Sequence, residues 1–223
     1  MMARTLSATL GAQKRRKLIL RTLVPSILVA AVTILTTGTS GANTLTVKDA
    51  KYNLSFTLPD QWREIPLSGG DISGLLDLAT KADPSMKSSL TAEVKQEAKA
   101  GVKIFALGPI VDQFASNVNV IVEPQAEGPS TPGYFNELGV EVKLNLASAG
   151  FKKLKTSKVH WSQGDVLQVT YTLHLATTSS LVKGVQDYVW HKGKIFIVTF
   201  SSSKLSVDKV VAQLVGQSWR WNE

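Results

Sequence analysis

The stretch from 186 to 202, QDYVWHKGKIFIVTFSS, constrains the fold more than any other part of the chain. Two apolar runs meet at Lys192 and Gly193, and a glycine there can take the positive φ that a tight hairpin turn requires. With this turn, Trp190 lies opposite Ile195. One face of the hairpin then carries Val189, Phe196, Val198 and Phe200, and the other carries Tyr188, Trp190, Ile195 and Ile197. Because both faces are apolar, the sequence predicts a central strand pair with a covering layer on each side.

The first 42 residues have the pattern of a secretory signal peptide. A basic cluster at 14–17 precedes an apolar run over 23–35, and Ser40 and Ala42 are the small residues of a cleavage site after Ala42. An uncleaved membrane anchor is the alternative, although a span takes about 20 apolar residues and this run is shorter. In either case we expect residues 43–223 to form a single exported domain, secreted or tethered to the membrane by this segment.

The charge of the chain belongs mostly to this leader. The formal net charge is +8, but six basic residues and no acid lie in residues 1–42, which leaves 19 basic residues against 17 acidic ones. A nucleic-acid-binding domain would be expected to keep a basic excess in its folded part, so no nucleic acid is expected as a partner. The chain has no cysteine. The exported part therefore depends on its hydrophobic core, without disulfides or a lipidated cysteine.

Alternating apolar patterns predict most of the strands. A strand or a linker is expected over 44–49, and strands are expected over 52–58, 102–107, 117–123, 151–161, 165–175, 181–191 and 194–202. Trp62 is expected as a core residue, and Gly108-Pro109 should close the strand that begins at 102.

One of these strands, over 151–161, carries four lysines: Lys152, Lys153, Lys155 and Lys158. Lysine commonly protects an exposed sheet edge, and this interpretation is favoured over nucleic-acid binding.

Helical patterns fill the gaps between the strands. Two helices are expected within 71–100, the first capped by Asp71, and two more over 132–149 and 206–216. Thr131 and Ser206 are the expected N-caps of the last two, and Gly150 should end the third. Their predicted buried stripes are Phe135, Leu138, Val142, Leu146 and Ala149, and Val207, Val210, Val211 and Leu214. The predicted fold class is α+β, a three-layer αβα sandwich around a largely antiparallel sheet of six or seven strands.

Several short motifs resemble a known fold family. They are YNLSFTLP at 52–59 with Trp62, FASNVNV at 114–120, Thr199-Phe200-Ser201 after the hairpin, and Ser218-Trp219 at the end of the last helix. The chain resembles the PsbP-like superfamily over roughly 50–223, and the FxxNVNV strand is similar to the cell-envelope branch of LpqN type. The resemblance implies a mostly non-enzymatic protein with no catalytic motif to carry over. The chain lacks the lipobox cysteine of that branch.

Metal and cofactor chemistry is not indicated. His160, His174 and His191 fall on three separate predicted strands, and no thiolate is present to complete a zinc site. We expect these histidines to face solvent. No phosphate-binding loop or dinucleotide fingerprint occurs in the sequence, so no cofactor is expected.

Catalytic residues are not indicated either. The segments 180–183 and 201–204 match S-x-x-K, but the S-D-N and K-T-G partners of a penicillin-recognising enzyme are absent from the sequence. Glu137 and Glu141 lie one helical turn apart on a predicted wet face, whereas paired catalytic carboxyls must face each other across a cleft. We therefore expect no enzyme activity.

The remaining candidates for ligand binding are aromatic. Trp219 and Trp221 are spaced so that an extended tail places them on one side, where they either cap the core or line a groove. His191 belongs to the turn 191–194, the only part of the central hairpin expected to be exposed. The sequence predicts a non-enzymatic exported binding or accessory module that contacts an envelope or membrane protein. A carrier of a small lipid or glycan, and a hydrolase with a scattered site, are the alternatives; the sequence defines no oligomeric state.

Overall fold

The structure is a computed structural model, and it describes residues 44–67, 100–111, 114–125, 128–129, 133–174 and 181–222. Its main sheet has seven strands in the order β3-β4-β5-β9-β8-β7-β6, and every neighbouring pair is antiparallel. In that order the strands are Arg63–Glu64, Val102–Val111, Phe114–Pro124, Lys194–Ser202, Leu181–His191, Gly164–His174 and Lys152–Trp161. A smaller sheet has the order β1-β2-β10, formed by Thr44–Asp49, Leu54–Pro59 and Arg220–Trp221. The described helices are α3, Tyr134–Ser148, and α4, Leu205–Ser218.

The predicted hairpin is confirmed as β8 and β9, at the centre of the main sheet. Lys192 and Gly193 have φ of 44° and 74°, the two positive values of a type I′ turn, and Trp190 pairs with Ile195 as expected. Both faces of the pair are buried among apolar side chains. Val198 is fully buried in one core cluster, and Ile197 is equally buried in the other.

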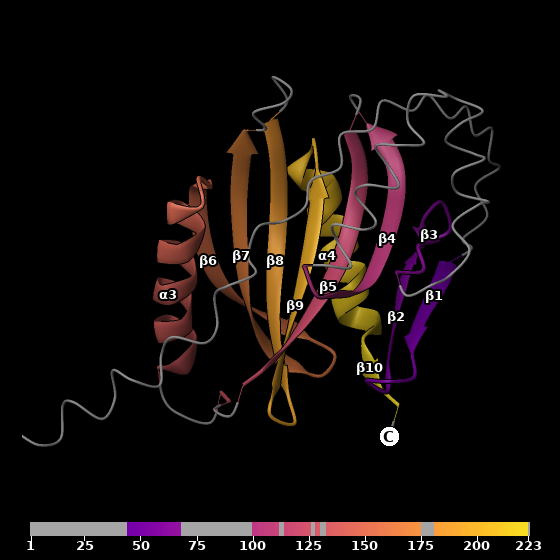
Figure 1. Ribbon diagram of the computed structural model, residues 1–223, viewed down its shortest axis with the longest axis horizontal. Coiled ribbons are helices and arrows are strands. Elements are labelled where there is room, and N and C mark those ends of the chain that lie inside the picture. Colours follow the sequence, from indigo (N-terminus) through magenta and orange to yellow (C-terminus); the bar gives the residue numbers. More distant parts are fainter. Residues whose placement is uncertain are drawn as a thin grey trace, which may run out of the picture.

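The sheet lies between two covering layers, as Figure 1 shows. Helix α3 packs on one face against β6 and β7, while α4 packs on the other face against β8, β9 and the neighbouring β2. The small sheet shares the second face with α4, because its apolar side chains join the core cluster that contains Val198. The predicted α+β fold with a sheet covered on both faces is confirmed. The expected strand over 52–58, however, belongs to this second sheet; the helices expected within 71–100 lie outside the described residues.

One strand is longer than expected and contains a glycine in close contact with an aromatic ring. Gly108-Pro109 was predicted to close the strand, but β4 continues to Val111 through an irregular register between Leu107 and Ile110. A Cβ on Gly108 would lie 2.5 Å from the ring of Trp62, which is buried as predicted. Gly108 therefore leaves room for the Trp62 ring, because it has no Cβ that would clash with it. The bulge allows Pro109 to remain in the strand.

The predicted N-caps of both described helices are wrong. Helix α3 begins at Tyr134 behind Gly133, whose φ is 90°, while Thr131 lies outside the described residues. Helix α4 begins at Leu205 with Lys204 as its N-cap, so Ser206 lies inside the helix. The end of α3 is as expected, since Gly150 has a φ of 91°.

The predicted buried stripes of α3 and α4 agree with the structure to different degrees. On α3, Leu138, Val142 and Leu146 are buried as predicted, but Ala149 is the C-cap residue and is exposed, so the predicted stripe is wrong at its last position. On α4, Val211 is buried but Val210 is 66% exposed, so the predicted stripe is wrong at this position. The inward face of α4 is instead formed by Asp208, Val211, Ala212, Val215 and Gly216. Small residues on this face let the helix approach the sheet closely, which a count of large apolar residues does not reveal.

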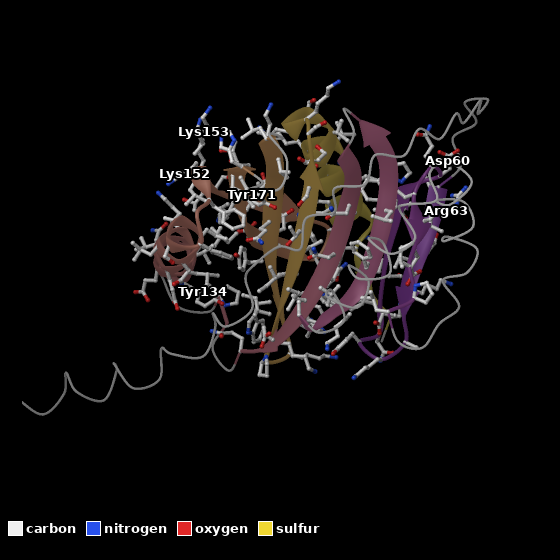
Figure 2. All side chains as sticks on the ribbon, turned by 45° about the horizontal axis from the view of Figure 1, so that its top comes forward. Asp60, Arg63, Tyr134, Lys152, Lys153 and Tyr171 are labelled. Carbon is white, nitrogen blue, oxygen red and sulfur yellow. The ribbon has the colours of Figure 1, made fainter. Side chains whose placement is uncertain are left out.

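The lysine-rich strand β6 forms one edge of the main sheet, as predicted. Lys152, Lys153 and Lys155 are exposed, and Figure 2 shows Lys152 and Lys153 on the side of the molecule opposite Asp60 and Arg63. The register shifts between Lys152 and Lys155, and Lys153 has a φ of 53°. Lysines and a bulge together protect a free edge from pairing with another chain. Among the described residues, no helix has the length and apolar character of a membrane span.

Candidate functional site

Three segments that are far apart in the sequence meet at one end of the molecule. The β8–β9 turn, the β1–β2 turn and the C-terminal strand β10 lie together at the bottom of Figure 1. Strand pairing brings β10 there, because Trp221 pairs with Leu54 and the backbone N–H of Asn222 donates to the carbonyl of Asn53 at 2.6 Å.

Aromatic rings connect these segments. The rings of His191 and Trp221 are stacked, with centroids 3.9 Å apart and an interplanar angle of 9°. Trp221 also contacts Phe196 at 4.9 Å, and the Tyr52 ring meets Phe196 edge-on at 5.8 Å. His191, Trp221 and Tyr52 are all partly exposed. We call the surface formed by Lys51, Tyr52, His191, Lys192, Lys194 and Trp221 the tip surface.

The backbone beneath the tip surface is held by contacts with the segment after β5. The N–H of Gln125 donates to the carbonyl of Gly193 at 2.8 Å, and the indole Nε1 of Trp190 donates to the carbonyl of Gln125 at 3.2 Å. Gly128 packs against the Trp190 ring so closely that a Cβ there would lie 2.6 Å from it. A type I′ turn with these additional bonds presents its side chains from a fixed backbone, and binding then costs less conformational entropy.

The charges of the tip surface come from lysines around the rings. Lys194 and Lys51 are exposed, and the Lys51 ammonium lies 5.6 Å from the centroid of the Tyr52 ring. The backbone N–H of Tyr52 donates to the Asp49 carboxylate at 3.0 Å. Burial, and secondly the charge of Asp49, raise the pKa of Tyr52, so its hydroxyl stays protonated. The surface thus offers aromatic faces, hydrogen-bond donors and ammonium groups.

The three residues predicted as ligand contacts differ in exposure, although the rings of Trp219 and Trp221 meet edge-on with centroids 5.5 Å apart. His191 and Trp221 come together in the ring stack, although the sequence did not predict their contact. Trp219 is fully buried, stacked on Phe56 at 5.3 Å and next to Trp161, so its ring caps the core and does not reach the surface. Sequence reasoning did not select Tyr52, because the alternation of its strand placed it on the buried side.

The histidines lie on separate strands, as expected, and are not brought together. His160 is exposed on β6 and pairs with Asp165 at 3.0 Å, while His174 is exposed at the end of β7. Hydrogen bonds from Lys158 and then from His160 lower the pKa of Asp165. The described part of the chain contains no group of three histidine or carboxylate side chains that could hold a metal.

The other chemical motifs are placed as follows. Ser201 of the second S-x-x-K segment is buried, and its hydroxyl lies 3.1 Å from that of Tyr171. The first such segment, 180–183, begins outside the described residues. Glu137 and Glu141 lie on α3, where Glu137 is exposed and Glu141 is half-buried.

An antiparallel sheet covered by helices and a small second sheet defines the class of the fold. The solved structures that are similar to this chain include the following two. One is the cyanobacterial PsbP (CyanoP) of Synechocystis sp. PCC 6803, with 15% sequence identity and a TM-score of 0.49. The aligned region covers 83% of this chain and 98% of the CyanoP chain. The other is LpqN of Mycobacterium tuberculosis, described as involved in cell envelope biogenesis, with 10% sequence identity and a TM-score of 0.41. The aligned region covers 79% of this chain and 89% of the LpqN chain. They are of the PsbP and LpqN types that the sequence resembles. No family model and no curated protein matches the chain.

Proposed function

We propose that the chain is a non-enzymatic, exported binding module of the cell envelope that contacts a partner protein through the tip surface. The leader pattern supports export, and the absence of cysteine fits a domain that is stabilised by its core alone. The partner is an envelope or membrane protein whose contact region offers apolar and acidic side chains, the complement of aromatic rings flanked by lysines.

The stack of His191 on Trp221 is the observation that carries this proposal. Tryptophan and tyrosine are enriched among the residues that dominate binding energy, because a large rigid ring is buried with little loss of side-chain entropy. Here three rings are partly exposed on a backbone fixed by strand pairing and by Gln125. A scaffold does not require aromatic side chains to remain accessible at the end of a hairpin, whereas a contact surface does.

Site-specific crosslinking in the producing cell tests the proposal. A photoreactive amino acid replaces Lys51 on the tip surface, and the control carries it at Lys143, an exposed lysine on α3. We expect one dominant adduct with an envelope protein from position 51 and none from position 143. Adducts of equal yield from both positions, or none from position 51 at full expression, would contradict the assignment of the tip surface.

A further inference from the structure

A block of uncharged polar side chains is buried within the main sheet, on the face that carries α3. These side chains come from four adjacent strands, and each is at most 2% exposed. The polar block consists of Asn117, Asn119, Tyr171, Gln186, Tyr188, Thr199 and Ser201. Sheets normally bury apolar side chains, so a block of this size requires an explanation.

Strand pairing arranges the block in two neighbouring rows. In the first row, Asn117 lies opposite Ser201, Ser201 opposite Gly184, and Gly184 opposite Tyr171. The Tyr171 ring lies over Gly184, where any Cβ would overlap it, and so its hydroxyl reaches Ser201 at 3.1 Å. The position of Tyr171 within the molecule is labelled in Figure 2.

The second row is also linked by hydrogen bonds. Asn119 lies opposite Thr199, and Thr199 lies opposite Gln186. Gln186 Nε2 donates to Thr199 Oγ1 at 3.2 Å, and the Tyr188 hydroxyl donates to Gln186 Oε1 at 2.9 Å. Each row therefore ends at an asparagine of β5.

The two asparagines differ from the rest of the block. Asn117 Nδ2 and Oδ1 and Asn119 Oδ1 are buried and have no hydrogen-bond partner among the residues that the structure describes. A buried polar atom without a partner destabilises a fold, and natural structures contain few of them. Two such side chains on one strand, both directed to the same face, point to a shared partner outside the chain.

We propose that Asn117 and Asn119 bind a small, uncharged molecule with hydroxyl or amide groups. The two positions lie about 7 Å apart along the strand. On the far side, β4 places Leu107 opposite Asn117 and Phe105 opposite Asn119, which gives the molecule an apolar wall.

The chemistry of the block excludes a charged ligand. None of its side chains carries a charge, and burial raises the pKa of Tyr171 and of Tyr188, which keeps both phenols neutral. An ion at this place would be buried among uncharged side chains, and the nearby carboxyls of Asp208 and Asp187 lie outside the block. A carboxamide both donates and accepts, as a hydroxyl or amide ligand also does.

The site is independent of the tip surface. Ser201 is seven residues along β9 from Lys194, a distance of about 23 Å, and its side chain lies on the opposite face from that of Phe196. Loss of ligand binding here would leave the proposed protein contact unaffected.

Non-denaturing mass spectrometry and titration calorimetry on the full-length protein test this inference. The spectra look for a small molecule that co-purifies from the producing cell, and N-acetyl-D-glucosamine and D-glucose serve as titration probes. We expect a co-purifying mass or saturable probe binding in the wild type, weakened at least tenfold by Asn117→Leu, which removes the polar atoms at similar volume. Asn136→Leu, at an exposed position on α3, is the matched control and should bind like the wild type.

Two results would overturn the inference. A wild type with neither a co-purifying mass nor saturable binding of either probe would mean that water alone serves the two carboxamides. Unchanged binding by Asn117→Leu would place the ligand elsewhere. If that variant does not fold, Asn119→Ala provides the same comparison, since it deletes the second unpartnered oxygen with a smaller change.

Discussion

Gly193 shows how a single residue decides the geometry of the tip surface. Its φ of 74° is unfavourable for a β-branched residue, while a Cβ at this position would meet no atom within 4 Å. Gly193→Val should therefore destabilise the protein through backbone strain alone, by about 1–2 kcal/mol. Gly193→Asn is the matched control. Because asparagine tolerates this backbone conformation, this variant should lose much less stability than Gly193→Val. Chemical denaturation measures both; equal stability of the two variants would contradict the turn.

Two buried carboxyls predict an unusual dependence of stability on pH. Asp187 accepts a hydrogen bond from Gln168 at 3.0 Å, and Asp208 is near Ser202 and Lys183. Burial raises the pKa of each to about 7 from an ordinary value of 3.8. Between these values the folded state keeps protons that the unfolded state has lost. The free energy of unfolding should therefore fall as the pH rises from about 4 to 7, by up to about 1.4 kcal/mol per pH unit for each carboxyl.

Asp187→Asn isolates one of the two carboxyls. The variant should be at least as stable as the wild type at pH 7, because its amide carries no charge to bury, and its stability should change less between pH 5 and pH 7. Urea denaturation at these two pH values measures the difference. The same slope in the variant and the wild type would show that Asp187 does not titrate in this range.

Helix α4 depends on a close contact with the sheet. A Cβ on Gly216 would lie 2.6 Å from the ring atoms Cδ1 and Nε1 of Trp161, and the Gly216 carbonyl accepts from the N–H of Ser162 at 2.9 Å. Gly216→Val should cost about 1–3 kcal/mol by overpacking. Val210→Ala, on the exposed side of the same helix, should change stability by less than about 0.5 kcal/mol. Thermal unfolding of both variants checks the orientation of α4, and the reverse order of effects would refute it.

The elements of this fold differ in how far the sequence defines them. The strands β6 to β9 are delimited by turn residues such as Gly164 and Gly193, and their predicted bounds agree with the structure within about a residue. The end of β4 and the inward face of α4 were not predictable in this way. Both contain a glycine on which a tryptophan ring packs, Trp62 on Gly108 and Trp161 on Gly216, and such contacts join segments that are far apart in the chain.

For the molecule as a whole, the central hairpin is the scaffold on which both layers rest. Val198 is fully buried between the sheet and the layer that contains α4. Val198→Asp should unfold the protein, at a cost of about 4 kcal/mol or more, because it buries a carboxylate without a partner. Val210→Asp places the same charge on an exposed position and is the control. Circular dichroism and thermal unfolding distinguish the two, and an unchanged melting temperature for Val198→Asp would disprove burial on both faces.

The candidate sites were only partly predictable from the sequence. His191 and Trp221 were selected as aromatic residues near a turn and the chain end, but their stacking depends on the pairing of β10 with β2. The Asn117-Val118-Asn119 segment was noted as a motif. Its chemical meaning appears only when β9 brings Thr199 and Ser201 next to it, since residues on neighbouring strands share no sequence pattern.

The affinity of the crosslinked partner for tip-surface variants tests the central claim most directly. Lys194→Glu reverses a charge on the tip surface, and Lys143→Glu makes the same change on α3; both lysines are exposed. Titration calorimetry with the full-length protein should show at least tenfold weaker binding for Lys194→Glu and for Trp221→Ala, with Lys143→Glu equal to the wild type. Equal affinity of all the variants would contradict binding through the tip surface.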